Sequence, residues 1–135
     1  MDSYDGFVQG SEMATTRRPP TRGELLDRAF VSAMRFRWQY RGYESKDKAI
    51  ARLRRQCPGF TTIQYTSAFQ KGTDLYKRAL EGVRANKKML KTLRPDTPGD
   101  IPRDVIEELR RRMPGFTLAT YKQAIVSVVL WHYWR

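Results

Sequence analysis

Basic side chains are the residues of this sequence whose types and spacing best suit a chemical task, the binding of an anion. The chain of 135 residues has 26 Lys and Arg against 14 Asp and Glu, which gives a formal net charge of +12. Charges of one sign repel each other in a compact fold, and an anionic partner relieves that repulsion. We therefore expect a polyanion as partner, with nucleic acid ahead of an acidic protein or an anionic membrane surface.

Arginines gather at two places that share the same sequence context. Arg54 and Arg55 come shortly before a Pro-Gly-Phe-Thr sequence, and Arg110, Arg111 and Arg112 come shortly before a second copy of it. Two arginine clusters beside equivalent turns would suit a bipartite site for phosphate groups. Cations in the last turn of a helix also interact favourably with its macrodipole, so these arginines have a structural explanation as well.

A third basic group lies between the two clusters, in a long segment with helical periodicity. Its candidate phosphate contacts are Lys77, Arg84, Lys87, Lys88 and Lys91. Most of them recur at helical spacings and form a stripe opposite the apolar positions, and such a stripe would follow a phosphate backbone. An ordinary solvated helix face is the alternative explanation.

Catalytic and metal-binding chemistry has little support in the sequence. His132 is the sole histidine and lies near the end of the chain, so no Ser/His/Asp or metal-ligand constellation is indicated. Glu107 and Glu108 are adjacent, and on a helix they would point about 100° apart rather than form an acid/base pair. We expect a protein without enzyme activity, cofactor or metal.

The number of cysteines and the distribution of apolar residues indicate the cellular compartment in which we expect the protein. Cys57 is the only cysteine, which excludes an intrachain disulfide, and its counterpart in the second half of the chain is Met113. A position shared by Cys and Met favours a soft apolar core side chain over a nucleophile. There is no apolar N-terminal run and nothing close to roughly 20 consecutive apolar residues. We expect a cytoplasmic protein with no membrane span.

The two Pro-Gly-Phe-Thr sequences belong to a longer internal similarity. Residues 49–69 and 105–125 match at a constant offset of 56 positions, as Leu53 matches Leu109 and Tyr65 matches Tyr121. So many identities in one register indicate an internal duplication. We assign residues 1–20 to a disordered tail and 21–135 to one helical domain, with repeat units at 44–94 and 100–135.

Each residue of the repeated sequence has a structural role in a turn between two helices. Pro58 ends the preceding helix, and Gly59 can adopt positive φ. Thr61 can cap the next helix, and Phe60 can pack against Tyr65 as a hydrophobic staple. A DNA-binding helix-turn-helix is not indicated, because apolar residues occupy the positions that would read bases.

Apolar periodicity predicts an all-α fold of about five helices. The expected ranges are 24–43, 45–56, 61–93, 102–112 and 118–135. Gly72 and Gly82 lie on the apolar face of the third helix, where each costs about 1 kcal/mol relative to alanine. We expect a neighbouring helix to approach closely at both glycines, and a break near Gly72 is the alternative.

The last predicted helix is apolar on nearly all sides. Such a helix is usually central in a core or part of an oligomer interface. We therefore predict Trp131, Tyr133 and Trp134 as interface residues, with a membrane-interface belt of indoles as the weaker alternative. Two functions remain open at this point: a small basic protein that contacts nucleic acid or another polyanion, and a protein–protein interaction module, including a homodimer through this helix.

Overall fold

The computed structural model describes residues 18–38, 44–88 and 101–133, with the backbone alone for residues 132 and 133. Its elements are α3 (Arg22–Arg37), α4 (Lys46–Gln56), α5 (Thr62–Ala85), α7 (Arg103–Arg112), α8 (Leu118–Val128) and the π-helical turn η3 (Val129–Tyr133). The described ranges hold five α-helices and no strand, which confirms the predicted all-α class. Most of the predicted tail lies outside them.

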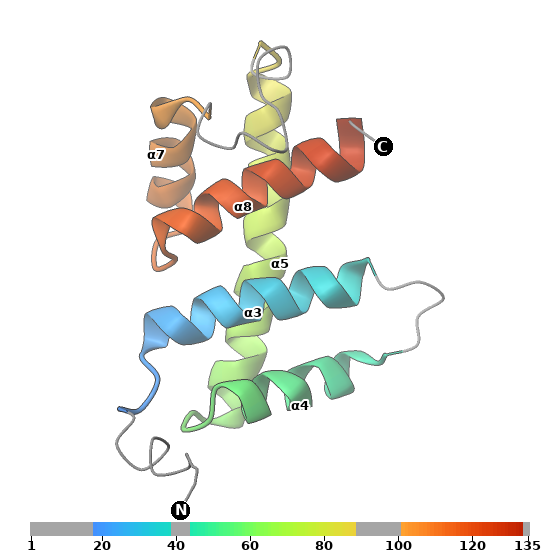
Figure 1. Cartoon of the computed structure of the whole chain (residues 1–135), viewed down its shortest axis with the longest axis vertical. Helices are drawn as coiled ribbons and strands as arrows, with labels where there is room; N and C mark the ends of the chain where they lie inside the picture. Colours follow the sequence, from blue (N-terminus) through green and yellow to red (C-terminus); the bar gives the residue numbers. More distant parts are fainter. Residues whose placement is uncertain (1–17, 39–43, 89–100, 134–135) are drawn as a thin grey trace, which may run out of the picture.

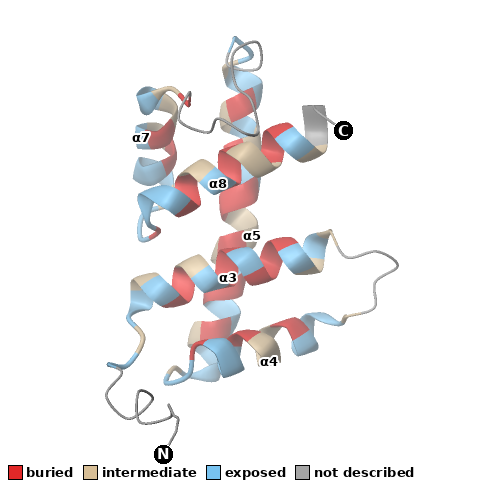
Figure 2. Cartoon of the chain, in the orientation of Figure 1, coloured by how far each residue is buried: buried red, intermediate tan, exposed pale blue. Residues whose placement is uncertain are grey.

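Helix α5 is the element on which the others are assembled. In Figure 1, α3 and α8 cross α5 one above the other, while α4 lies near its start and α7 near its end. Helices α3 and α4 run in opposite directions as a pair. The buried residues coloured in Figure 2 are concentrated where these helices meet. None of the helices in the described ranges has the length and apolar character needed to cross a membrane.

The crossing of α3 over α5 depends on Gly72. A Cβ added at this glycine would lie 2.8 Å from the Cα of Phe30 and 2.9 Å from the carbonyl oxygen of Ala29. Both contacts are backbone atoms, so the two helices touch main chain to main chain. The predicted close approach is confirmed at Gly72, and α5 is continuous through it. At Gly82 the prediction is wrong, because the nearest neighbour of an added Cβ is Val105 Cγ1 at 4.0 Å.

The predicted extent of α5 to Leu93 is also wrong. The helix ends at Ala85, and the N–H of Asn86 donates to the carbonyl oxygen of Val83 at 3.1 Å. Asparagine is a weak helix former because its side chain competes for backbone hydrogen bonds. The two lysines that follow would add like charges within one turn of Arg84, which opposes further helix.

The corner between α4 and α5 is closed by a tyrosine hydroxyl. Tyr65 donates to the carbonyl oxygen of Cys57 at 2.7 Å and accepts from the N–H of Phe60 at 3.2 Å. The rings of Phe60 and Tyr65 meet edge to face at 5.9 Å, which confirms the predicted staple. Gly59 has φ of 107°. Cys57 is buried, and burial raises the pKa of its thiol, in agreement with the predicted core role.

The corner between α7 and α8 has the same geometry. Tyr121 donates to the carbonyl oxygen of Met113 at 2.7 Å and accepts from the N–H of Phe116 at 3.3 Å. Gly115 has φ of 109°. The two corners thus agree in backbone conformation and in hydrogen bonding, whereas the duplication of the chain itself stays a prediction.

Helix caps explain where the helices after the corners begin. The hydroxyl of Thr61 accepts from the N–H of Gln64, and the side chain of Gln64 accepts from the N–H of Thr61 at 2.8 Å. In the second corner the corresponding residue is Thr120, whose hydroxyl lies 3.2 Å from Thr117 Oγ1. The N–H of Thr117 donates to Asp27 of α3 at 3.1 Å, which links α3 to the start of α8.

Helix α3 begins two residues earlier than predicted. Thr21 and Glu24 form a reciprocal capping box, which satisfies two N–H groups at the helix start. The N–H of Thr21 holds the pKa of Glu24 below its usual value, and Arg18 adds an ion pair at 3.2 Å. The helix ends at Arg37 with Trp38 as its C-cap, so the predicted extent to residue 43 is wrong.

Candidate anion-binding surface

The arginines of α7 are paired with acidic residues on the same helix. Arg110 lies 3.7 Å from Glu107, and Arg111 forms an ion pair with Glu108. Hydrogen bonds from Arg111 and Arg112 hold the pKa of Glu108 below its usual value. The positive charge of this predicted cluster is therefore largely neutralised.

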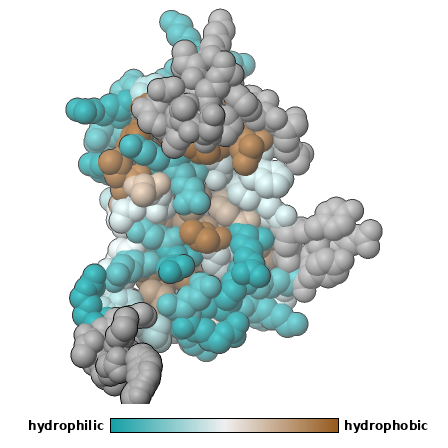
Figure 3. Space-filling model, viewed as in Figure 1, coloured by the Kyte–Doolittle hydropathy of each residue, from teal (hydrophilic) through white to brown (hydrophobic). Residues whose placement is uncertain are grey.

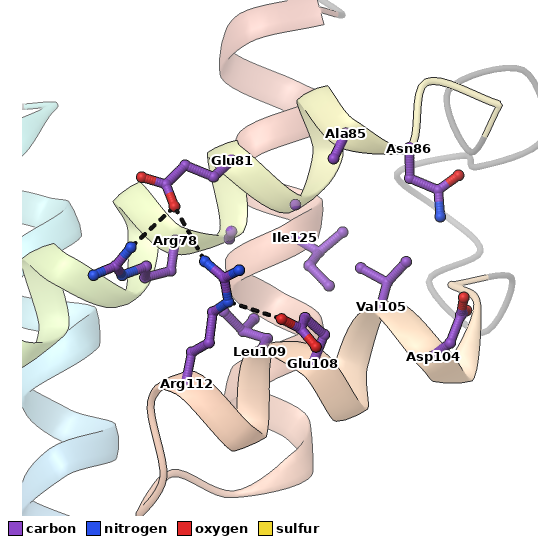
Figure 4. A pocket seen from close by; sticks show the side chains of 12 residues that line it. Arg78, Glu81, Ala85, Asn86, Asp104, Val105, Glu108, Leu109, Arg112 and Ile125 are labelled. Atoms are coloured by element: carbon purple, nitrogen blue, oxygen red, sulfur yellow. Dashed lines mark hydrogen bonds and ion pairs between the residues drawn. The ribbon is translucent and has the colours of Figure 1, made fainter.

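Arg112 also connects α7 to α5. Its Nε donates to Glu108 at 2.8 Å, and its guanidinium lies 3.8 Å from Glu81, which accepts from Arg78 at 3.1 Å. Figure 4 shows these side chains along one edge of a groove of about 550 Å³ between the two helices. Gly82 lies in the lining of this groove.

The two predicted arginines of α4 have no acidic partner among the described residues. Arg54 lies over the ring of Tyr65 at 5.5 Å and donates to Thr62 Oγ1 at 3.4 Å. Arg55 is exposed. Within the described part of the chain, neither guanidinium forms an ion pair.

A further arginine of α4 joins that helix to α3. The side chain of Arg52 is only 11% exposed; it forms an ion pair with Glu44 and donates to Ser32 Oγ at 3.1 Å. Ser32 in turn donates to the carbonyl oxygen of Ala49 at 3.3 Å. These contacts fix the register of α3 against α4.

Additional cations surround Arg52. Burial lowers the pKa of its guanidinium, and the positive charges of Arg35 on α3 and Arg55 on α4 lower it further. Arg28 and Arg35 lie two turns apart on the side of α3 that carries Ser32, and Lys48 and Arg55 lie two turns apart on the side of α4 that carries Arg52. All four are exposed, and none forms an ion pair with another described residue. We call Arg28, Arg35, Lys48, Arg52 and Arg55 the α3–α4 basic surface.

The predicted lysine stripe is shorter than expected. Lys77 and Arg84 are exposed on one side of α5, two turns apart. Lys87 and Lys88 are exposed but follow the end of the helix, so they do not continue its register. Lys91 lies outside the described residues. In Figure 3, which has the orientation of Figure 1, hydrophilic residues cover most of the surface around α4.

The predicted interface residues are only partly described. Trp131 is half-buried and stacks on Trp38 of the same chain, with ring centroids 4.8 Å apart and planes at 20°. Trp38 also meets Tyr76 edge to face at 5.2 Å. The side chain of Tyr133 and the whole of Trp134 lie outside the described part, and a homodimer through this helix stays a prediction.

Sequence reasoning missed Arg28, Arg35, Lys48 and Arg52. The spacing is visible in the sequence. The residues of the surface follow each other at spacings of four and three on both helices, as Arg28, Ser32 and Arg35 on α3 and as Lys48, Arg52 and Arg55 on α4. What the spacing could not show is that the two helices lie side by side. No group of His, Cys, Asp and Glu in the described ranges could hold a metal ion. No protein-family model, curated protein or solved structure matches this chain, so a functional proposal must come from its own geometry.

Proposed function

We propose that this protein is a non-enzymatic nucleic-acid-binding protein that contacts phosphates through the α3–α4 basic surface, without sequence specificity. The observation that carries the proposal is the 3.1 Å hydrogen bond from Arg52 of α4 to Ser32 of α3, which brings the exposed cations of the two helices onto one surface. Glu44 offsets the charge of Arg52, whereas the exposed cations around it form no ion pair with a described residue, so an anion that bridges them relieves their repulsion.

Arginine is suited to this role. A guanidinium group presents a planar fork of donors that binds phosphate oxygens in pairs, and it stays charged near the surface of a protein. Contacts to phosphates carry no sequence information, and they depend steeply on salt because bound counterions are released.

The other basic groups fit the role less well. On α7, Glu107 and Glu108 compensate the arginine charges, so binding an anion there would first require breaking ion pairs. On α5, Lys77 and Arg84 belong to a single helix, about 10.5 Å apart, so they make one row of charge rather than a surface shared by two helices.

Fluorescence anisotropy with a labelled nucleic acid of random sequence tests the proposal. Three double variants each remove two positive charges: Arg35→Gln/Arg55→Gln, Lys77→Gln/Arg84→Gln and Arg110→Gln/Arg111→Gln. Because net charge is equal in all three, differences among them report position. We expect the first variant to weaken binding by about tenfold for each lost phosphate contact at low salt, and the third to leave it nearly unchanged.

Circular dichroism should show that the three variants retain their helix content. Equal loss of affinity in all three would mean that only net charge matters, which would contradict the assignment of the surface. Absence of binding by the unaltered protein at about 50 mM salt would contradict the proposal as a whole, since phosphate contacts are strongest there.

A further inference from the structure

We infer that the α3–α4 basic surface binds double-stranded nucleic acid in preference to single strands. The inference rests on the proposed function and names the class of partner for the same surface. It follows from three properties: the arrangement of the cations in two rows, the rigidity of the two helices that carry them, and the charge density of the partner.

The exposed cations form two antiparallel rows. Arg28 and Arg35 make the row on α3, and Lys48 and Arg55 make the row on α4, which runs the opposite way (Figure 1). Within each row the charged residues are seven positions apart, about 10.5 Å along the helix. Packed helices have axes about 8–10 Å apart. The Cα atoms of these four residues therefore lie near the corners of a rectangle with sides of about 10 Å.

Contacts within the protein fix the register of the rows. Arg52 of α4 donates to Ser32 of α3 at 3.1 Å, and the two helices run in opposite directions in Figure 1. The start of α3 therefore faces the end of α4. The hydrogen bond from Ser32 to Ala49 holds the pair at its middle, and the backbone contact at Gly72 holds α3 on α5.

The two helix backbones fix the positions from which the four side chains extend, and fixed positions favour a rigid partner. A flexible single strand must give up conformational freedom to place its phosphates within reach of these side chains, and this entropy opposes binding. A duplex has a persistence length of about 50 nm and is already ordered on the scale of this surface. It also presents phosphates on two strands, which suits cations placed in two rows.

Charge density favours the duplex as well. Duplex DNA carries one negative charge per about 1.7 Å of axis, twice the density of one strand, and more counterions are released for each contact. The logarithm of affinity falls with the logarithm of salt concentration with a slope of about −0.9 per contact for duplexes and about −0.7 for single strands. Four contacts predict slopes of about −3.6 and about −2.8.

The test is binding of one sequence as a duplex and as its labelled single strand, each titrated between about 50 and 200 mM salt. We expect tighter duplex binding at the lower salt and a loss of affinity of about 150-fold over this range, against about 50-fold for the single strand. Arg28→Gln/Arg35→Gln removes the row on α3, and Lys48→Gln/Arg55→Gln removes the row on α4. Each should reduce the duplex slope by about 1.8, while Arg110→Gln/Arg111→Gln should leave it unchanged.

The outcomes separate the inference from the proposed function. Equal or tighter binding of the single strand, still lost in both row variants, would overturn the inference and leave the proposed function standing. Loss in only one row variant would overturn the two-row arrangement. Failure of the unaltered protein to bind either form at the lower salt would overturn both.

Discussion

Substituting alanine for Gly72 and, separately, for Gly82 tests the central helix crossing with a matched pair of changes in one helix. Each substitution adds one methyl group to α5, and each should gain about 1 kcal/mol from the better helix propensity of alanine. The two sites differ in what the new methyl group meets. The difference in unfolding free energy between the variants therefore isolates the packing of α3 on α5.

At Gly72 the methyl group would lie 2.8 Å from Phe30 Cα and 2.9 Å from the carbonyl oxygen of Ala29. Ordinary contacts begin near 3.4 Å, so the helices must move apart by roughly half an ångström. Both neighbours are backbone atoms and cannot rotate away, which places the strain near the upper end of about 1–3 kcal/mol for overpacking. After the gain from propensity, we expect Gly72→Ala to destabilise the fold by about 2 kcal/mol.

At Gly82 the methyl group would meet Val105 Cγ1 at 4.0 Å, an ordinary van der Waals distance. We expect Gly82→Ala to stabilise the fold by about 0.5–1 kcal/mol. Urea unfolding followed by circular dichroism measures both values, with equal slopes indicating that the unfolded state is unchanged. A Gly72→Ala variant as stable as the unaltered protein would refute the close approach of α3 to α5.

Two further predictions concern the corners and acid stability. Tyr65→Phe and Tyr121→Phe each remove a hydroxyl that links two backbone groups of a corner, so each should cost about 1–3 kcal/mol in urea unfolding, and equal losses would show that the corners are energetically alike. Hydrogen bonds from Arg111 and Arg112 lower the pKa of Glu108 in the folded protein. The contribution of Glu108 to folding stability is therefore present above its unfolded pKa of about 4.3, and it is lost as the pH falls through the folded pKa. Glu108→Gln should flatten the fall of stability on acidification, and an unchanged profile between about pH 5 and pH 2 would contradict these ion pairs.

Helix boundaries were predictable where a capping side chain stands next to an apolar run. Ser45 accepts from the N–H of Lys48, and Thr61 accepts from that of Gln64, as their places in the sequence indicate. The end of α5 was missed because the apolar pattern continues past Asn86, and pattern alone does not weigh a weak helix former followed by lysines.

The tyrosine hydroxyls were missed for a different reason. Their acceptors are carbonyl groups of residues that come eight positions earlier, and the two are near each other only after the glycine takes positive φ. The basic surface was missed because its cations come from two helices whose pairing is tertiary. Each row is visible in the sequence, but the Arg52–Ser32 hydrogen bond that joins them spans 20 residues.

The two corners have the same geometry but different electrostatic surroundings, and two of the positions that differ decide whether the arginines have acidic partners on their own helix. Glu107 and Glu108 of α7 correspond, 56 residues earlier, to Ala51 and Arg52 of α4. Residues 107–112 therefore hold three arginines and two glutamates, whereas residues 51–56 hold three arginines and no acid. On α7 the glutamates turn the arginines into local ion pairs, one of which extends to α5. On α4 the third arginine, Arg52, pairs with Glu44 and donates to Ser32 of α3, which leaves Arg54 and Arg55 without an ion pair among the described residues. A shared scaffold thus supports a neutralised helix at one corner and a cationic surface at the other, which is why we place phosphate binding on α3 and α4 alone.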